Sequence, residues 1–284
     1  MAVALPLACA ALAALSYGIG SVMQAAAVRH AENRPNLDPL SPVRLVGQLP
    51  YVAGLALDLL GFVASVIALR TLPLFVVQSA IAGSVGVTAI GASIVFGPRL
   101  LGYERAALVA LMVGFVLLAV SARPERAAWL GSVGQGILVC GVIVVLAAGA
   151  FSARLDNRKA GIGLAACAGL SWAGTGIAAR VLQVPSSPWR LLIDPIALCL
   201  AGYGLLGMLL FATALQRGSV TAAAAIVFTI ETVVPSLIGI AVLSDHARSG
   251  FLLVAVVGFV ATVGGSIALA RRSEPLPREA VPSS

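Results

Sequence analysis

Charged residues are scarce in this 284-residue chain. Asp, Glu, Lys and Arg together make up 10% of it, and lysine occurs once, at Lys159. Hydrophobic residues make up 60%, and the mean hydropathy is +1.04. A soluble domain has about 25% charged and about 45–50% apolar residues, so this composition does not suit a surface that water covers. The sequence therefore indicates a polytopic membrane protein and excludes most soluble functions.

Long polar segments and the motifs of soluble enzymes are also lacking. The polar stretches are about 17 residues at most, which leaves no room for a separate soluble domain of ~100–150 residues. The sequence has no glycine-rich phosphate loop and no nucleophile elbow. Its two histidines, His30 and His246, do not have the spacing of metal ligands. We therefore expect no enzymatic activity and no cofactor.

Cysteines are few and widely separated. Cys9, Cys140, Cys167 and Cys199 fall in different apolar runs without C-x-x-C spacing, which indicates neither a disulfide framework nor a metal cluster. The net charge of +7 comes from basic residues scattered between the apolar runs, so the sequence has no dense basic patch for nucleic acid. The expected partners are the lipid bilayer and a small ion or small-molecule substrate, and a homodimer is the assembly we consider.

Nine apolar runs are long enough to cross the ~30 Å hydrocarbon core of a bilayer as helices, which takes ~20 residues each. The predicted spans are 3–28, 45–69, 72–96, 104–121, 131–151, 161–182, 191–215, 219–243 and 250–270. The first run is longer than the ~7–15-residue core of a signal peptide and lacks a basic start, so we expect it to be a span. The predicted fold class is an all-α polytopic membrane protein, a nine-span helical bundle.

Basic residues are unevenly distributed over the predicted loops. The loops after the first, third, fifth and seventh spans, together with the C-terminal tail, carry 12 of the 18, and the other side carries six. The positive-inside rule then places the C-terminus in the cytoplasm and the N-terminus outside. Abundant alanine and arginine with a single lysine suggest a high-GC bacterial genome, so we expect a bacterial inner-membrane location.

Four short motifs recur in the same order along the chain. Leu15-Ser16-Tyr17 is repeated at Leu170-Ser171-Trp172, Leu59-Leu60-Gly61-Phe62 at Leu205-Leu206-Gly207-Met208, Ala68-Leu69-Arg70 at Ala214-Leu215-Gln216, and Val113-Gly114-Phe115-Val116 at Val257-Gly258-Phe259-Val260. Four matches in one order indicate two related units of four spans. Because the second unit begins on the opposite side of the membrane, the repeats are inverted, a pattern typical of transporters with a site near the midplane.

The predicted organisation follows from this repeat. A first transmembrane repeat covers 1–124, a linking fifth span 125–158, a second repeat 159–272, and a disordered cytoplasmic tail 273–284. The expected functional site therefore lies within the bundle rather than in a loop or in the tail.

Two ionisable residues are predicted near span centres, Asp58 and Glu231. Such a side chain costs at least ~2.5–3.5 kcal/mol at mid-bilayer on insertion scales, so each is a hypothesis for a functional site. No Lys or Arg is predicted at comparable depth, so the two carboxyls would attract a proton or a cation and are the candidate ligands of Mg²⁺ or another metal ion. Alternatively, each carboxyl is protonated or bonded to a neighbouring helix and only fixes packing. For Glu104, Asp194 and Asp245, which lie at span ends, we expect interfacial solvation.

Neutral polar and aromatic residues complete the candidate substrate site. The candidate ligands on the third and eighth spans are Gln78, Ser79, Thr229 and Thr232. Tyr17 and Trp172 occupy equivalent depths in the two repeats, where their ring faces could contact an organic cation. The alternative is that these residues serve tight helix packing and the core.

The stretch Leu72–Ile90 resembles a segment of the NIPA-type magnesium transporters, a branch of the drug/metabolite transporter superfamily. In that segment a proline is followed by Leu-Val-Thr-Pro and then by Ala-Leu-Ser-Val, and the coinciding residues here are Pro73, Val77, Ala82, Ser84, Val85, Ala89 and Ile90. The resemblance implies nine spans, an external N-terminus and magnesium transport. The family's glutamate in the second span corresponds to Phe62, and Asp58 lies one helical turn earlier on the same face.

Three functions are compatible with these features. The first is a secondary transporter or channel-like permease of the drug/metabolite type for Mg²⁺ or another cation. The second is a proton-coupled exporter of a small metabolite or drug, in which one carboxylate carries protons and Tyr17 and Trp172 touch the substrate. The third, from a different class, is a non-transporting membrane scaffold of an envelope-building complex.

Overall fold

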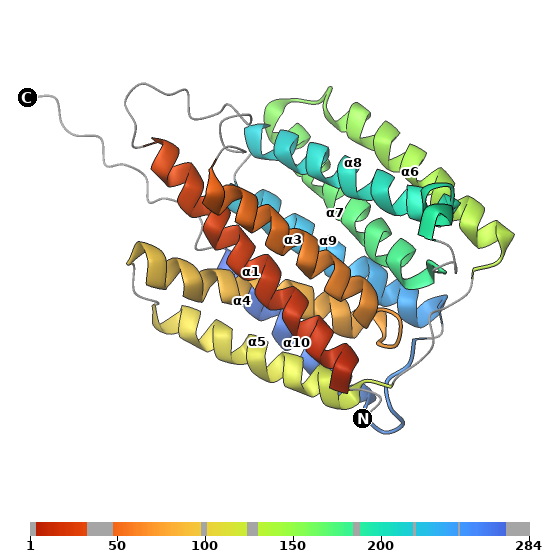
Figure 1. The fold of residues 1–284 in the computed structure, drawn as a ribbon, viewed down its shortest axis with the longest axis horizontal. Helices are drawn as coiled ribbons and strands as arrows, with labels where there is room; N and C mark the ends of the chain where they lie inside the picture. Colours follow the sequence, from red (N-terminus) through yellow and green to blue (C-terminus); the bar gives the residue numbers. More distant parts are fainter. Residues whose placement is uncertain are drawn as a thin grey trace, which may run out of the picture.

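The computed structural model describes residues 4–32, 48–97, 101–123, 130–183, 188–217, 220–243 and 245–270. Its helices are α1 (Ala4–Glu32), α3 (Leu49–Ala68), α4 (Leu74–Phe96), α5 (Gly102–Ser121), α6 (Ser132–Ser152), α7 (Asn157–Val181), the short 3-10 helix η1 (Pro188–Leu192), α8 (Pro195–Arg217), α9 (Val220–Ala241) and α10 (Leu252–Ala270). They lie side by side as one bundle, and successive α-helices run in alternate directions (Figure 1). The predicted tail, 273–284, lies outside the described residues.

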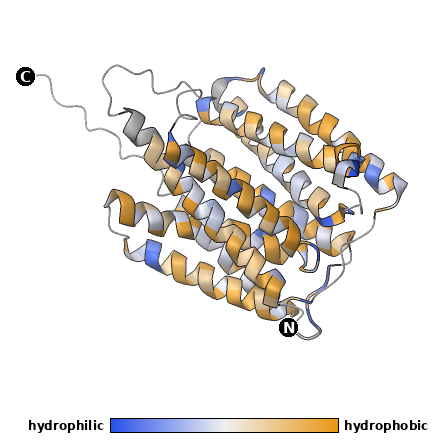
Figure 2. Cartoon of the chain, in the orientation of Figure 1, coloured by the Kyte–Doolittle hydropathy of each residue, from blue (hydrophilic) through white to orange (hydrophobic). Residues whose placement is uncertain are grey.

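Most of these helices have the length and composition of membrane spans. In the described part of the chain, eight helices are long and apolar enough to cross a bilayer, and a ninth, α9, contains a shorter apolar stretch, Ile226–Ala241. Hydrophobic residues cover the helices, and hydrophilic residues lie mainly near the helix ends (Figure 2). The chain is therefore a multi-pass integral membrane protein. Its ninth span stays a prediction.

Helix boundaries follow local sequence signals. Pro73 takes the N-cap position of α4, and that helix ends at Gly97, whose positive φ of 86° is a left-handed conformation that favours glycine. The side chain of Asp194 accepts hydrogen bonds from the backbone N–H groups of Ile196 and Ala197, each at 2.9 Å, and so caps the start of α8. Because such signals are local, the predicted span ends fall within a few residues of the observed helix ends.

The two halves of the chain pack in the same order. α1 packs against α3 and α4, as α7 packs against α8 and α9, and α4 contacts α5 as α9 contacts α10. Between the halves, α4 contacts α9, and α5 lies along α10 in an extensive interface. α6, the predicted linking span, packs on α7 and α8 at the edge of the bundle (Figure 1).

Contacts between single residues also follow the predicted repeat. The Tyr17 ring packs on Gly61 in the first half, and the Trp172 ring packs on Gly207 in the second. Where α5 meets α10, a Cβ atom built on Gly114 would lie 2.6 Å from the Gly258 carbonyl oxygen, and one on Gly258 would lie 2.9 Å from the Gly114 carbonyl oxygen. Two related units facing each other would make reciprocal contacts of this kind. The inverted relation between the halves stays a prediction.

Candidate functional site

The two predicted carboxyls, Asp58 and Glu231, both lie within electrostatic reach of Tyr17. Tyr17 is in α1, Asp58 in α3 and Glu231 in α9, and both carboxyls are within electrostatic reach of the Tyr17 hydroxyl. Ser65 of α3 is within hydrogen-bonding reach of the same hydroxyl. The helices meet here because α4 packs against both α1 and α9. The structure thus brings residues from both halves of the chain into one polar region.

Asp58 is bonded to a neighbouring helix. The Gln24 Nε2 atom of α1 donates a hydrogen bond of 2.6 Å to Asp58 Oδ2. The helices approach closely at this point because Gly20 faces the carboxylate, and a Cβ atom on Gly20 would lie 2.8 Å from Asp58 Oδ1. The geometry therefore supports the packing interpretation of Asp58. We did not predict Gln24, although its place two helical turns after Tyr17 puts both residues on one face of α1.

Glu231 has different surroundings. Its side chain is half-buried, and among the described residues it makes no hydrogen bond and no ion pair. Pro235 lies inside α9 and has no N–H group to donate to the Glu231 carbonyl oxygen one turn earlier. Glu231 therefore offers a carboxyl group and a backbone oxygen at one level of the bundle. On the same helix, Thr232 is buried and Thr229 is half-buried.

Three buried polar atoms on α4 and α7 lack partners within the described part of the chain. Gln78 and Ser79 are buried on α4, and Ser171 is buried on α7. Among the described residues, no hydrogen-bond partner is present for Gln78 Oε1, Ser79 Oγ or Ser171 Oγ. The Gln78 side chain packs directly on Gly176 of α7. A buried polar group without a partner costs about 1–3 kcal/mol, so these atoms favour binding of water or of a polar ligand in the interior.

Trp172 serves the core between two helices. Its ring packs on Gly207 of α8, and its centroid lies 5.4 Å from that of Phe211 with the two planes tilted by 57°. This tilted arrangement is typical of packed aromatic pairs. The geometry supports the core-aromatic interpretation of Trp172, whereas Tyr17 lies beside the carboxyls.

A buried ion pair closes one end of the bundle. An Arg180 guanidinium nitrogen lies 2.7 Å from Asp245 Oδ1, and both side chains are fully buried. The guanidinium also donates a bond of 2.6 Å to the Leu69 carbonyl oxygen, and Asp245 Oδ2 accepts a bond of 2.7 Å from the Leu74 N–H at the start of α4. The expectation of interfacial solvation for Asp245 is therefore wrong. Its oxygens bind the buried Arg180 guanidinium and the N–H group at the buried start of α4, where solvent does not reach.

A second arginine makes a reciprocal contact at the same end. Arg70, after α3, donates a hydrogen bond to the Leu182 carbonyl oxygen after α7, and burial lowers the pKa of its guanidinium. We call Arg70, Arg180 and Asp245 the end cluster. It joins the α3–α4 loop, the end of α7 and the α9–α10 loop. The sequence signal for Arg180 is its position just inside the end of the span predicted over 161–182, although it counts among the six basic residues of the outer side.

Glu104 also differs from its expected interfacial solvation. It is buried, and its carboxylate accepts a hydrogen bond of 2.7 Å from the Leu101 N–H at the start of α5. Asp194 is half-buried and caps α8, so its polar role at a helix start agrees with its position near a span end. Glu104 is buried rather than solvated because its side chain folds back onto the start of its own helix, α5.

Metal ligands are not gathered in the described part of the chain, where no three His, Cys, Asp or Glu side chains form a group that could hold a metal ion. Comparisons with protein-family models, with curated proteins and with solved structures find no match. The similarity of Leu72–Ile90 to the NIPA-type segment therefore stays a prediction from the sequence.

Proposed function

We propose that the chain is a secondary transporter of the drug/metabolite type, whose solute pathway passes the interior polar region around Tyr17, Ser79 and Glu231. The observation that carries this proposal is Glu231 itself. It is an ionisable group in an apolar multi-span bundle, it lies within electrostatic reach of Tyr17, and it has no cationic partner among the described residues. Ionisable groups in such positions mark ion and proton pathways in membrane proteins.

Proton coupling is the form of transport that the geometry supports best. A carboxyl group without a fixed partner can gain and lose a proton without breaking an ion pair, whereas Asp58 is already bonded to Gln24. The unpartnered atoms of Gln78 and Ser79 would hydrogen-bond water or a polar group of the solute. In this proposal Glu231 carries the proton, Tyr17 and the α4 residues contact the solute, and Asp58 holds α1 on α3.

Alternating access requires one end of the bundle to open while the other closes. The end cluster supports a closed outer end, because Arg180 and Asp245 of the second half of the chain bond to the Leu69 carbonyl oxygen and to the Leu74 N–H group of the first half. In the orientation predicted from the basic residues, this end faces away from the cytoplasm. We propose that opening of the outer end breaks the bond of Arg180 to Leu69 and the bond of Asp245 to Leu74.

Cation transport is the second candidate. It is favoured by one observation, that Asp58 and Glu231 both lie within electrostatic reach of Tyr17. The backbone oxygen that Pro235 leaves without its usual donor would add a neutral ligand. Mg²⁺ keeps several waters and takes few carboxylates, so a site with only two acidic groups suits it.

The test is a flux measurement with the full chain in proteoliposomes. A pH-sensitive dye inside the vesicles reports proton movement when small amines, amino acids and nucleosides are added one at a time, and a magnesium-sensitive dye reports Mg²⁺ entry under an imposed potential. We expect a solute-dependent pH change that Glu231→Gln abolishes. Asp156→Asn is the matched control, because Asp156 is an exposed acid at the start of α7.

The other outcomes separate the alternatives. Mg²⁺ entry that depends on the potential and is lost in Glu231→Gln would favour the cation pathway. Equal flux in Glu231→Gln and wild type would contradict the proposed role of Glu231. Absence of every flux from correctly folded protein would favour a scaffold without transport.

A further inference from the structure

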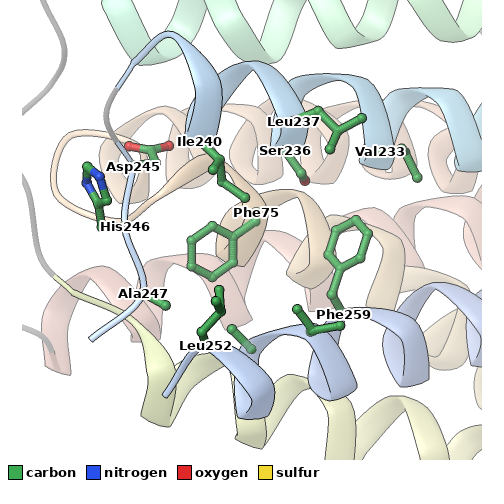
Figure 3. Close-up of a pocket in the computed structure, with 12 residues that line it drawn as sticks. Phe75, Val233, Ser236, Leu237, Ile240, Asp245, His246, Ala247, Leu252 and Phe259 are labelled. Carbon is green, nitrogen blue, oxygen red and sulfur yellow. The ribbon is translucent and has the colours of Figure 1, made fainter. Parts of the chain in front are cut away.

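A groove of about 250 Å³ lies between α9 and α10, with Phe75 of α4 as its floor (Figure 3). Its lining is almost entirely hydrocarbon. It is formed by residues of α9, of α10, of the loop between them and by Phe75 of α4. The groove plays no part in the polar region around Glu231 and does not depend on the proposed transport.

The groove opens toward the bilayer. Four residues of its lining, Leu237, Ile240, Leu252 and Val256, are between 51% and 69% exposed, although all are large and apolar. Their helices belong to the apolar bundle, so the phase that they face is the hydrocarbon of the membrane. A molecule enters this groove sideways from the lipid rather than from water.

Two polar side chains of the lining, Asp245 and Ser236, are already engaged. Asp245 bonds to Arg180 and to the Leu74 N–H, and the Ser236 hydroxyl donates a bond of 2.5 Å to the Thr232 carbonyl oxygen. Asp245 lies at the loop end of the groove, away from the two phenylalanine rings (Figure 3). The apolar part thus has no polar partners for ordered water, which needs two to four. An empty groove would leave its walls without contacts.

We propose that this groove is a binding site for one hydrocarbon chain of a membrane lipid. The lining offers only dispersion contacts, the rim meets the acyl phase, and the volume lies below the roughly 300–1,000 Å³ of sites for drug-sized molecules. The chain would lie between Phe75 and Phe259, with its head toward the loop that carries Asp245, because that loop marks the end of the helices. Association within a bilayer depends on packing of this kind.

Photolabelling of the full chain in nanodiscs tests the site. The probe is a phosphatidylcholine with a diazirine in its acyl chain, present as a minor component, and adducts are mapped by mass spectrometry. We expect adducts to concentrate on the α9 and α10 residues of the groove, above those on the outer face of α6, where Ile143 and Val144 are equally open to lipid. Unlabelled lipid of the same chain length should compete for the groove but not for α6.

Two substitutions make the test specific. Ala255→Phe fills the back of the groove, and Val256→Trp covers it from the exposed rim, so both should reduce the groove adducts to the level of the α6 face. The tryptophan side chain in Val256→Trp needs no space in the core, so this variant tests the site if the Ala255→Phe protein does not fold. Leu253→Phe is the control, since Leu253 is exposed on the same helix outside the groove. Wild-type adducts no denser in the groove than on α6, or adducts undiminished by the substitutions, would overturn the proposal.

Discussion

Asp58 and Glu231 are both acidic residues within apolar helices, yet they have different partners. Asp58 accepts a hydrogen bond from Gln24 across the α1–α3 interface, and Glu231 has no such bond among the described residues. A bonded carboxyl stabilises a helix contact, whereas one without a fixed partner is able to exchange a proton or an ion. We therefore expect substitutions at the two positions to have different effects.

The first prediction concerns Asp58. Asp58→Asn should leave flux and stability close to wild type, because the amide oxygen still accepts the hydrogen bond from Gln24. Asp58→Leu should lower the free energy of unfolding by about 1–3 kcal/mol, since it leaves the Gln24 amide without a partner. Thermal unfolding of the purified variants in detergent measures the difference. Equal stability of Asp58→Asn and Asp58→Leu would show that the hydrogen bond does not hold α1 on α3.

The second prediction concerns the end cluster. Arg180→Met should destabilise the protein by about 3–5 kcal/mol, because it leaves the buried Asp245 carboxylate without its cation. Arg190→Met is the control, since Arg190 is exposed at the same end and its guanidinium lies over the ring of Trp189. Both variants are compared by thermal unfolding. A loss no larger than that of the control would mean that the ion pair contributes little to closing this end.

At the scale of helices, close packing between α5 and α10 depends on facing glycines. A Cβ atom on Gly258 would lie 2.9 Å from the Gly114 carbonyl oxygen, while one on Gly264 of the same helix meets nothing within 4 Å. Gly258→Ala should therefore cost about 1–3 kcal/mol through overpacking, and Gly264→Ala should be neutral or slightly stabilising. Unfolding of the two variants in the same detergent checks this. Similar losses from both substitutions would contradict the observed interface.

The positions of the helices are the part of the fold that the sequence predicts well. Runs of apolar residues and breaks such as Pro73 and Gly97 act locally, so the ends of α4 follow from its own residues. The partners of a side chain do not follow in this way. Gln24 and Asp58 are 34 positions apart, and Arg180 and Asp245 are 65 apart, so only the packing of whole helices brings them together.

For the whole molecule, the distribution of basic residues predicts an orientation. The structure changes the count of loop charges behind this prediction, because Arg180 is buried in an ion pair and is not a loop charge. Without Arg180, twelve basic residues lie on the predicted cytoplasmic side and five on the outer side. The excess of basic residues on the cytoplasmic side is then larger.

Cysteine labelling tests this orientation in cells. In a background with the four native cysteines replaced by alanine, Gln183→Cys after α7 should react with a membrane-impermeant maleimide added outside. Leu155→Cys, in the turn between α6 and α7, should react only after the cells are permeabilised. Both native residues are exposed, so access through the membrane decides the result. The opposite labelling pattern would invert the topology and would place the end cluster on the cytoplasmic side.

The central claim is that a solute pathway passes the interior polar region, and reactivity of a cysteine there toward a water-soluble reagent tests it without knowledge of the substrate. Ser79→Cys and Ala168→Cys replace two fully buried residues, one in the polar region and one in the apolar core. In the cysteine-free protein, a small water-soluble thiol reagent should modify Ser79→Cys and leave Ala168→Cys unmodified. If both cysteines resist the reagent equally from either side, the polar residues serve only packing and the transport proposal fails.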